Sequence, residues 1–567
     1  MIGRRTAFGL GLAVILMAGL AGGLLLWKGD SLMGLLGLRS QNKMAELLPA
    51  ERTLVYAGMA LNIRNQQGFQ TIQRLYLDNP DFQSLFDEAK AGMETSNGMD
   101  FETEIQPWLG TEVGMAVIVP EPTEEVDDLF GFTPPAFVVG LASKDDAKAR
   151  DFILAQIERV ESEEGAVVVE RSHNGVSYWV EEKTGYDWQT PRAVTLYEGM
   201  VLHATDEATL QAVIDQGQAS EGALAQSDAF QRLRNALPSE ALALITMNQS
   251  SYMDMLSNMV GGLSMFPMGN DQFDTMQAQS EMLLMTGVSL VLEREGLRFD
   301  MAQLYDESKL TDEMRSLYDE SHSDALLPYV PSDALLFTTM TNVDSMVAQY
   351  QAQLELMPND EEGVDTVDMM MESIFGPGFD MEGDLAAWVG EDLLITINPS
   401  GGAELPVSGW MMMDSRDLAA SQGFIERMSE QMSMELSPQA VGPHSFQLAQ
   451  DSWSEEAMLA FGHVDDRLVV TMPGEAATQF AQPLGSTIKD NAGYQRLMGH
   501  LDSGYNSLFY LSFDEIERVM APEMGLNASE LAEFRAVIGP LVAFGATNSA
   551  RMDNGLVRGR AYLLLEE

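Results

Sequence analysis

Apolar and polar residues alternate along the chain in a pattern that predicts an α+β unit. The stretches TLVYAGMAL, GMAVIVP and AFVVGLAS read as strands, and KDDAKARDFILAQIERV reads as a helix whose apolar face includes Phe152, Ile153 and Ile157. GAVVVERSHNGVSYWVEE alternates on both sides of a His-Asn-Gly turn, and AVTLYEGMVLHAT does so around Glu198-Gly199; both predict hairpins. Hairpins with helices grouped between them predict a largely antiparallel sheet covered by helices on one face.

One motif occurs twice. DFETEIQPWLGTEV, residues 100–113, returns as DMEGDLAAWVGEDL, residues 380–393. Including this one, six such pairs occur in the same order along the chain, and their offset shrinks from 282 residues at Pro49 and Pro331 to 259 at Gly296 and Gly555. An ordered series of this kind predicts an internal duplication, and hence two tandem, homologous lobes.

Each shared position of the motif has a predicted structural role. Asp100 suits the N-cap of a helix, and Ile105 and Trp108 lie on one helical face. Gly110 falls where a left-handed helix C-cap is wanted, and a strand is expected from Val113. The matching residues of the second copy are Asp380, Leu385, Trp388 and Gly390. We therefore interpret the motif as repeated architecture.

The N-terminal region predicts attachment to a membrane. Residues 6–27 carry no charge and are long enough to cross a bilayer as a helix, and Arg4 and Arg5 precede them. This pattern predicts a single transmembrane signal anchor, with the bulk of the chain on the extracytoplasmic side of the cell membrane. A cleavable signal peptide ending at GLA, before Gly22, is the alternative.

The repeats and the N-terminal segment divide the chain. The predicted parts are a cytoplasmic N-terminus (1–5), the signal anchor (6–27), a tether (28–45), a first α+β repeat (46–307), a connector (308–325) and a second α+β repeat (326–567).

Composition narrows the function further. The formal net charge is -54, from 86 acidic and 32 basic side chains, which argues against a nucleic-acid partner. The chain has no cysteine, so disulfides, thiol nucleophiles and zinc-thiolate sites are excluded.

The motif block DFETEIQPWLGTEVGMAV, the opening LLPAERTLVYAGM, the block AFQRLRNALPSEALALITMN and the N-terminal segment together resemble a bacterial family of domains of unknown function, catalogued as thirty-three fifty-two. The resemblance implies a membrane-anchored extracytoplasmic protein with no assigned reaction, cofactor or catalytic residue. The second copy departs from it at Ala387, where the first has Pro107.

Candidate chemistry is sparse. The six histidines lack the spacing of a helical metal pair, and the short motifs STIK (486–489) and KTG (183–185) occur in the reverse of the order found in penicillin-recognising enzymes. The acids Glu102, Glu104, Glu382 and Asp384 are interpreted as first-turn helix residues. The 39 methionines are interpreted mainly as core filling, with a pliable binding surface or Cu(I) binding as alternatives.

The sequence therefore predicts a non-enzymatic binding or scaffold protein with no cofactor, whose partners are the membrane, through the N-terminal helix, and an unknown protein or apolar ligand. The alternatives are an envelope hydrolase that uses carboxylates near the Trp-x-Gly turns, and methionine-based copper handling. The burial of the motif's carboxylates distinguishes the binding protein from the hydrolase, because acid–base catalysis needs carboxylates that converge in a pocket.

Overall fold

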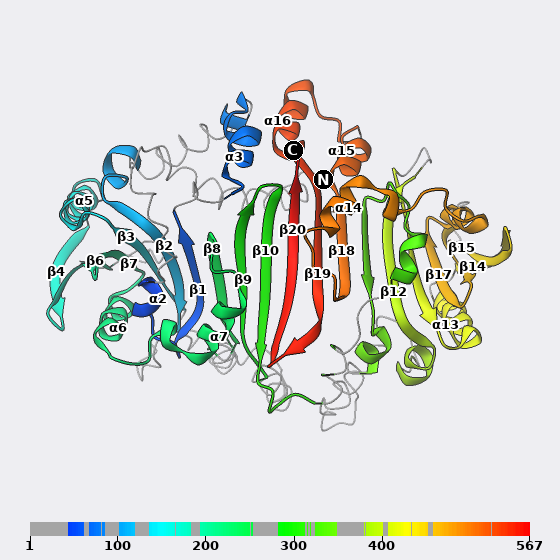
Figure 1. Ribbon diagram of the computed structural model, residues 1–567, viewed down its shortest axis with the longest axis horizontal. Coiled ribbons are helices and arrows are strands. Elements are labelled where there is room, and N and C mark those ends of the chain that lie inside the picture. The colour runs from blue at the N-terminus through cyan, green and yellow to red at the C-terminus, as the bar shows by residue number, and fades with distance from the viewer. Residues whose placement is uncertain are drawn as a thin grey trace. The chain divides into compact units, whose positions relative to one another are not determined.

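The computed structural model describes most of the chain beyond residue 42 (Figure 1). The described residues are 43–61, 67–80, 82–84, 101–119, 135–164, 166–182, 193–249, 251–252, 282–311, 315, 318, 324–348, 379, 381–400, 406–431, 434–451, 457–522 and 524–566. The predicted N-terminus (1–5), anchor (6–27) and nearly all of the tether (28–45) lie outside them.

The chain forms two compact units. Unit 1 comprises residues 1–267, 283–294 and 299–304, and unit 2 comprises residues 268–282, 295–298 and 305–567. Residues 295–298 and 305 belong to unit 2, in keeping with two backbone hydrogen bonds to residues near the C-terminus. Leu565 N–H donates to Glu295 O (2.9 Å), and Tyr305 N–H donates to Gly555 O (2.7 Å). The repeat boundaries at 46–307, 308–325 and 326–567 stay predictions.

Ten of the described strands lie between residues 53 and 305. They are β1 (Thr53–Ala60), β2 (Leu109–Ile118), β3 (Ala136–Ser143), β4 (Val167–His173), β5 (Val176–Glu182), β6 (Ala193–Tyr197), β7 (Met200–Ala204), β8 (Ala243–Asn248), β9 (Leu283–Glu293) and β10 (Gly296–Tyr305). The α-helices are α2 (Lys43–Leu47), α3 (Phe69–Ile72), α5 (Asp146–Arg159), α6 (Glu207–Gln218) and α7 (Asp228–Ala236). Shorter turns are η3 (Gln73–Leu77), η4 (Phe101–Ile105), η5 (Val160–Glu164) and η6 (Leu224–Gln226).

The second copy supplies a matching set. Its strands are β11 (Leu336–Met340), β12 (Val389–Pro399), β13 (Val407–Ser415), β14 (Met434–Val441), β15 (His444–Asp451), β16 (Ala457–Val464), β17 (Arg467–Met472), β18 (Tyr505–Ser512), β19 (Leu541–Asp553) and β20 (Leu556–Leu565). Its helices are α13 (Leu418–Gln431), α14 (Ala492–Met498), α15 (Phe513–Met520) and α16 (Ala528–Ile538), with η7 (Asp324–Tyr329), η8 (Met381–Ala386), η9 (Gly474–Ala481) and η10 (Ile488–Asp490).

Both units pair their strands in the same order. In unit 1 the order is β4-β5-β6-β7-β3-β2-β1-β8-β9, and in unit 2 it is β14-β15-β16-β17-β13-β12-β11-β18-β19. The predicted hairpins are confirmed. The β4–β5 turn has Asn174 and Gly175 at positive φ, and the β6–β7 turn has Glu198 and Gly199 at positive φ, as tight hairpin turns require.

The predicted fold class needs correction. All twenty strands belong to a single, mostly antiparallel sheet and strand dominates the fold, whereas the sequence predicted two separate sheets in an α+β arrangement. Residue alternation predicts where strands form and which side chains share a face, but it does not predict which strands pair. The predicted transmembrane helix also finds no support: no helix within the described ranges is long and apolar enough to span a membrane.

Helices cover both faces of the sheet in each unit, whereas one covered face was predicted. In unit 1, α2 packs Met44 against Gly114 and Gly140, beside α6, and α7 places Phe230 against Tyr56. On the other face, α5 packs Phe152 and Ile153 over Trp108 and Val201. Unit 2 repeats this with α14 on one face and α13 on the other.

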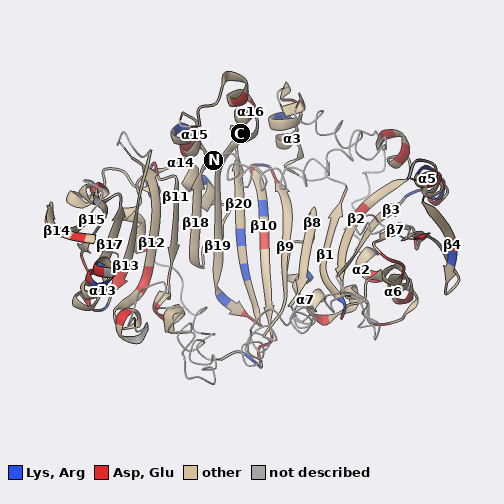
Figure 2. Ribbon diagram, turned by 180° about the vertical axis from the view of Figure 1, so that it is seen from behind, with Lys and Arg blue, Asp and Glu red and all other residues tan. Residues whose placement is uncertain are grey.

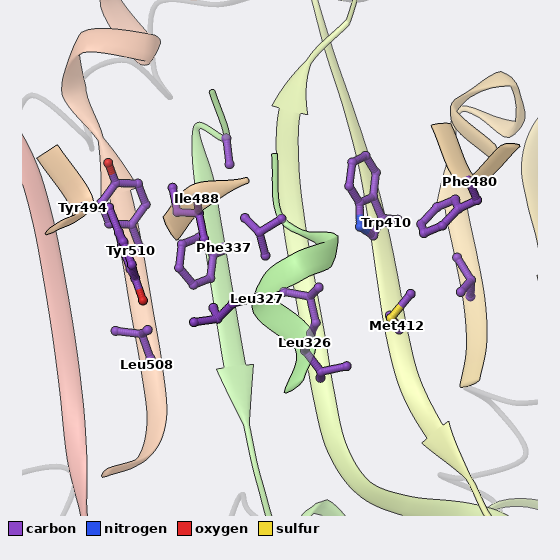
Figure 3. Close-up of a cluster of buried hydrophobic side chains, with 14 of the residues drawn as sticks. Leu326, Leu327, Phe337, Trp410, Met412, Phe480, Ile488, Tyr494, Leu508 and Tyr510 are labelled. Carbon is purple, nitrogen blue, oxygen red and sulfur yellow. The ribbon is translucent and has the colours of Figure 1, made fainter. Parts of the chain in front are cut away.

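An extensive core of unit 2 lies between the sheet and the first of these helix layers. Figure 3 shows Phe337, Tyr494 and Tyr510 grouped on one side of it, with Trp410, Met412 and Phe480 on the other. The rings of Phe337 and Tyr510 stack with centroids 5.3 Å apart, and those of Trp410 and Phe480 meet edge to face at 5.5 Å.

Candidate functional site

The repeated motif forms the same short turn in each unit. Unit 1 has η4 and unit 2 has η8, and both are π-helical, as the bond from Gln106 N–H to Phe101 O (2.9 Å) illustrates. The wider π-helical turn replaces the α-helix that the residue spacing predicts. Asp100 and Asp380, the predicted N-caps, lie outside the described residues.

The two tryptophans have matching environments. Trp108 and Trp388 are each 1% exposed, and each indole N–H donates to the backbone oxygen four residues earlier: Glu104 O at 2.8 Å and Asp384 O at 2.6 Å. Each ring tilts by 39° against a phenylalanine of the covering helix, Phe152 in α5 or Phe424 in α13. Ile105 and Leu385 pack into the same two clusters. The motif therefore pins one helix to the sheet in each unit.

The role predicted for Gly110 and Gly390 is wrong. Both lie inside strands, β2 and β12, and neither has a positive φ. A Cβ at Gly110 would lie 3.0 Å from Ala142 O, and one at Gly390 would lie 2.7 Å from Asp414 Cβ and 2.9 Å from Asp414 O. The glycines are needed because the neighbouring strand passes too close for a side chain.

The motif's acids are bound by arginines of the covering helices. Glu104 accepts from Arg159 at 3.0 and 3.2 Å, and Asp384 is paired with Arg427 at the equivalent place in unit 2. Glu102 is exposed. Each paired carboxylate thus helps to hold its covering helix, and neither lies in an apolar pocket as a general acid would need.

Other predicted candidates do not gather into a reaction centre. Within the described residues, no group of three His, Cys, Asp or Glu side chains could hold a metal ion. Met411, Met412 and Met413 are consecutive in β13, so Met412 is buried on one face while its neighbours lie on the other. Lys489 pairs with Asp324 (3.0 Å), and residues 183–185 lie outside the described part, as do the methionines at 253–268 and 369–371.

Two buried carboxylates occupy equivalent strand positions. Glu112 in β2 is 5% exposed and Asp392 in β12 is 7% exposed. Glu112 accepts from the N–H groups of Lys43 (3.3 Å) and Met44 (3.4 Å), so it caps the start of α2. Burial raises the pKa of Glu112 above its ordinary value, and these two N–H groups oppose the rise.

A surface that the sequence analysis did not identify is the apolar sheet face of unit 1 that lies beyond α5 and that no described helix covers. We call it the open face of unit 1. One row of neighbouring residues runs across five strands and comprises Val139, Met115, Ala57, Ile245 and Val288. Met115 is 42% exposed and Ile245 is 51% exposed. A second row comprises Phe137, Val117, Val55, Met247 and Thr286.

Unit 2 has the same surface in the same place, the open face of unit 2. Its first row comprises Met411, Ile395, Thr338, Phe509 and Ala546, and its second row comprises Gly409, Ile397, Leu336, Leu511 and Phe544. Ile395 and Ile397 are each 39% exposed. Strands β1, β8, β11 and β18, which form the middle of these faces, contain no charged residue (Figure 2).

The open faces left a signal in the sequence. Strands such as GMAVIVP and AFVVGLAS are apolar at consecutive positions, which indicates apolar side chains on both faces of the sheet. The sequence could not show where α5 packs on this face, because its contacts are with residues far away in the chain, such as Trp108 and Val201; among the described residues α5 covers one end of the face.

Comparisons with known proteins give a family but no activity. The family model described as "Protein of unknown function (DUF3352)" matches residues 10–565. No match was found among curated proteins. A solved structure titled "Structure of crystal form III of TP0453" aligns with 49% of this chain and 88% of its own at 12% identity, but its TM-score of 0.22 is too low to support a shared fold.

Proposed function

The chain belongs to the DUF3352 family of proteins of unknown function, and from this premise we propose that it is a non-enzymatic binding protein that holds a neutral hydrocarbon chain on its open faces. The observation that carries the proposal is the recurrence of an exposed apolar face at the same strand positions in both units. A solvated surface has no need for apolar rows of this length, and large exposed apolar patches mark binding surfaces.

The dimensions of the open faces suit one extended chain. Strands lie about 4.8 Å apart, so a row across five strands spans roughly 19 Å. One acyl chain spans roughly 15 Å, half of a bilayer's hydrocarbon core. A row of exposed Met, Ile and Val side chains can therefore contact such a chain along its whole length, and the unbranched, flexible methionines adapt to its shape.

Charge favours a neutral ligand over other occupants. The net charge of -54 repels anionic molecules, and it also opposes the pairing of two copies through these faces. We also propose that the protein works on the extracytoplasmic side of a cell membrane, where such chains are abundant; the alternative interpretation of the N-terminal residues, a cleavable export signal ending before Gly22, supports this location.

Titration of the full-length protein with a fluorescent long-chain alcohol tests the proposal. Met115→Glu and Ile395→Glu place a carboxylate at equivalent sites on the two open faces, and together they should weaken binding at least tenfold. Leu154→Glu is the matched control, because Leu154 is an exposed leucine (45%) on α5, outside the open faces. Its affinity should equal that of the wild type.

Three results would contradict the proposal. The first is equal binding by the wild type and the double variant. The second is tighter binding of the matching fatty acid than of the alcohol. The third is a dimer in sedimentation that the double variant abolishes, which would make a second copy the occupant.

A further inference from the structure

The buried face of unit 2 contains a polar cluster that unit 1 lacks. Thr396 and Asn398 in β12 lie opposite Trp410 and Ser408 in β13. All four side chains are on the helix-covered face, and their exposed fractions are 1%, 1%, 3% and 5%, respectively. In unit 1 the corresponding pairs, Ala116 with Val138 and Ile118 with Ala136, are wholly apolar and equally buried.

Three of these side chains each have one polar atom without a hydrogen-bond partner among the described residues. The free atoms are Asn398 Nδ2, Ser408 Oγ and Trp410 Nε1. Asn398 and Ser408 face each other directly across the strand pair, and Trp410 lies two residues along from Ser408 on the same face. Buried polar groups in folded proteins are almost always hydrogen-bonded, to protein or to ordered water.

The bonds of Thr396 restrict what can satisfy this cluster. Its hydroxyl has one proton, yet its oxygen lies 3.2 Å from Leu336 O and 3.0 Å from Asn398 Oδ1. The proton can serve only one of these acceptors fully. If it goes to Leu336 O, turning the Asn398 carboxamide lets Nδ2 donate to Thr396, and Oδ1 becomes the free atom. The occupant must therefore suit an amide in either orientation.

We propose that the Asn398–Ser408 pair is a buried water-binding site that belongs to unit 2 alone. Water both donates and accepts, so it satisfies the carboxamide in either orientation, along with the Ser408 hydroxyl and the Trp410 indole N–H. Two to four hydrogen bonds from otherwise unpaired groups are what a buried water ordinarily makes. Two apolar side chains lie beside this cluster on the same face: Phe337, which is opposite Thr396, and Met412, two residues beyond Trp410.

The site makes the two copies chemically different. The corresponding strand pairs of unit 1 carry only apolar side chains, whereas those of unit 2 provide polar groups that suit bound water near the end of the β12–β13 pair. This inference is independent of the proposed function, because it concerns the covered face of the sheet and not the open one.

A crystal structure of the full-length protein tests the site. An oxygen-sized peak should lie within hydrogen-bond distance of the Asn398 carboxamide and of Ser408 Oγ or Trp410 Nε1. In the Asn398→Ile/Ser408→Ala variant, which introduces the residues of unit 1, the peak should vanish. Ser408→Ala alone is the milder variant: Asn398 and Trp410 should retain the peak.

Two outcomes would overturn the inference. One is a wild-type map in which all three groups bond to protein atoms with no density between them. The other is elongated density, which would show a ligand larger than water.

Discussion

Substitution by alanine should destabilise the protein less than substitution by asparagine at Gly390, whereas the order should be reversed at Gly175. At Gly390 any Cβ meets Asp414 Cβ and O at 2.7 and 2.9 Å, which forces β12 and β13 to shift. Overpacking of this kind costs about 1–3 kcal/mol for alanine. Asparagine adds further atoms to the same space, so Gly390→Asn should be the less stable of the two variants.

Gly175 is the matched control, because its glycine is needed for the opposite reason. Its φ is +82°, and no atom lies within 4 Å of a Cβ built there. The cost is backbone strain alone, roughly 1–2 kcal/mol for an ordinary L residue, and asparagine tolerates this conformation better than alanine. Gly175→Asn should therefore be more stable than Gly175→Ala.

Urea unfolding followed by circular dichroism measures both pairs. The midpoints should shift without a change in slope. A loss of about 2 kcal/mol corresponds to roughly 4–8 °C in Tm for units of this size. If Gly390→Asn proves at least as stable as Gly390→Ala, the close-approach explanation is refuted.

Three further predictions follow from the burial of single side chains. Trp108→Phe and Trp388→Phe each remove an indole N–H bond to a backbone oxygen, so each should lose about 1–2 kcal/mol in urea unfolding; unequal losses would contradict a shared role. Burial raises the folded-state pKa of Glu112. The contribution of this group to folding stability is therefore full below pH 4.5 and is lost as the pH rises through the folded-state pKa. The Tm of the wild type relative to Glu112→Gln should therefore fall as the pH rises above 4.5, and a constant difference would refute this. Burial lowers the pKa of His203 from 6.5 to about 4. The contribution of His203 to folding stability is therefore present above pH 6.5 and is lost as the pH falls toward 4. In thermal melts, the His203→Thr variant should lose less stability than the wild type as the pH falls from 6.5 to 4.

The sequence predicted local structure and repetition well, because both depend on residues close together in the chain. The turns at Asn174-Gly175 and Glu198-Gly199 followed from residues that accept positive φ. The paired motifs around Trp108 and Trp388 do occupy the same environment in the two units. The family was identified from the same blocks.

The roles of single motif residues were harder to predict. Gly110 and Gly390 follow a tryptophan at a spacing that suits a helix cap, yet their requirement comes from Ala142 and Asp414, which lie on another strand. Glu104 and Asp384 looked like first-turn acids, and their partners Arg159 and Arg427 are more than 40 residues away. Sequence spacing contains no information about such distant neighbours.

By itself the sequence determined the pattern of strands, the hairpin turns, the repetition of one unit and the family, because periodicity and turn chemistry act over a few residues. Only the tertiary structure decided which strand edges join, which face each helix covers and which apolar rows stay exposed. These are decided by contacts between residues far apart in the chain. Strands that are apolar on both faces leave either face free to be covered, and the lengths and positions of α5 and α13 settle which part remains open.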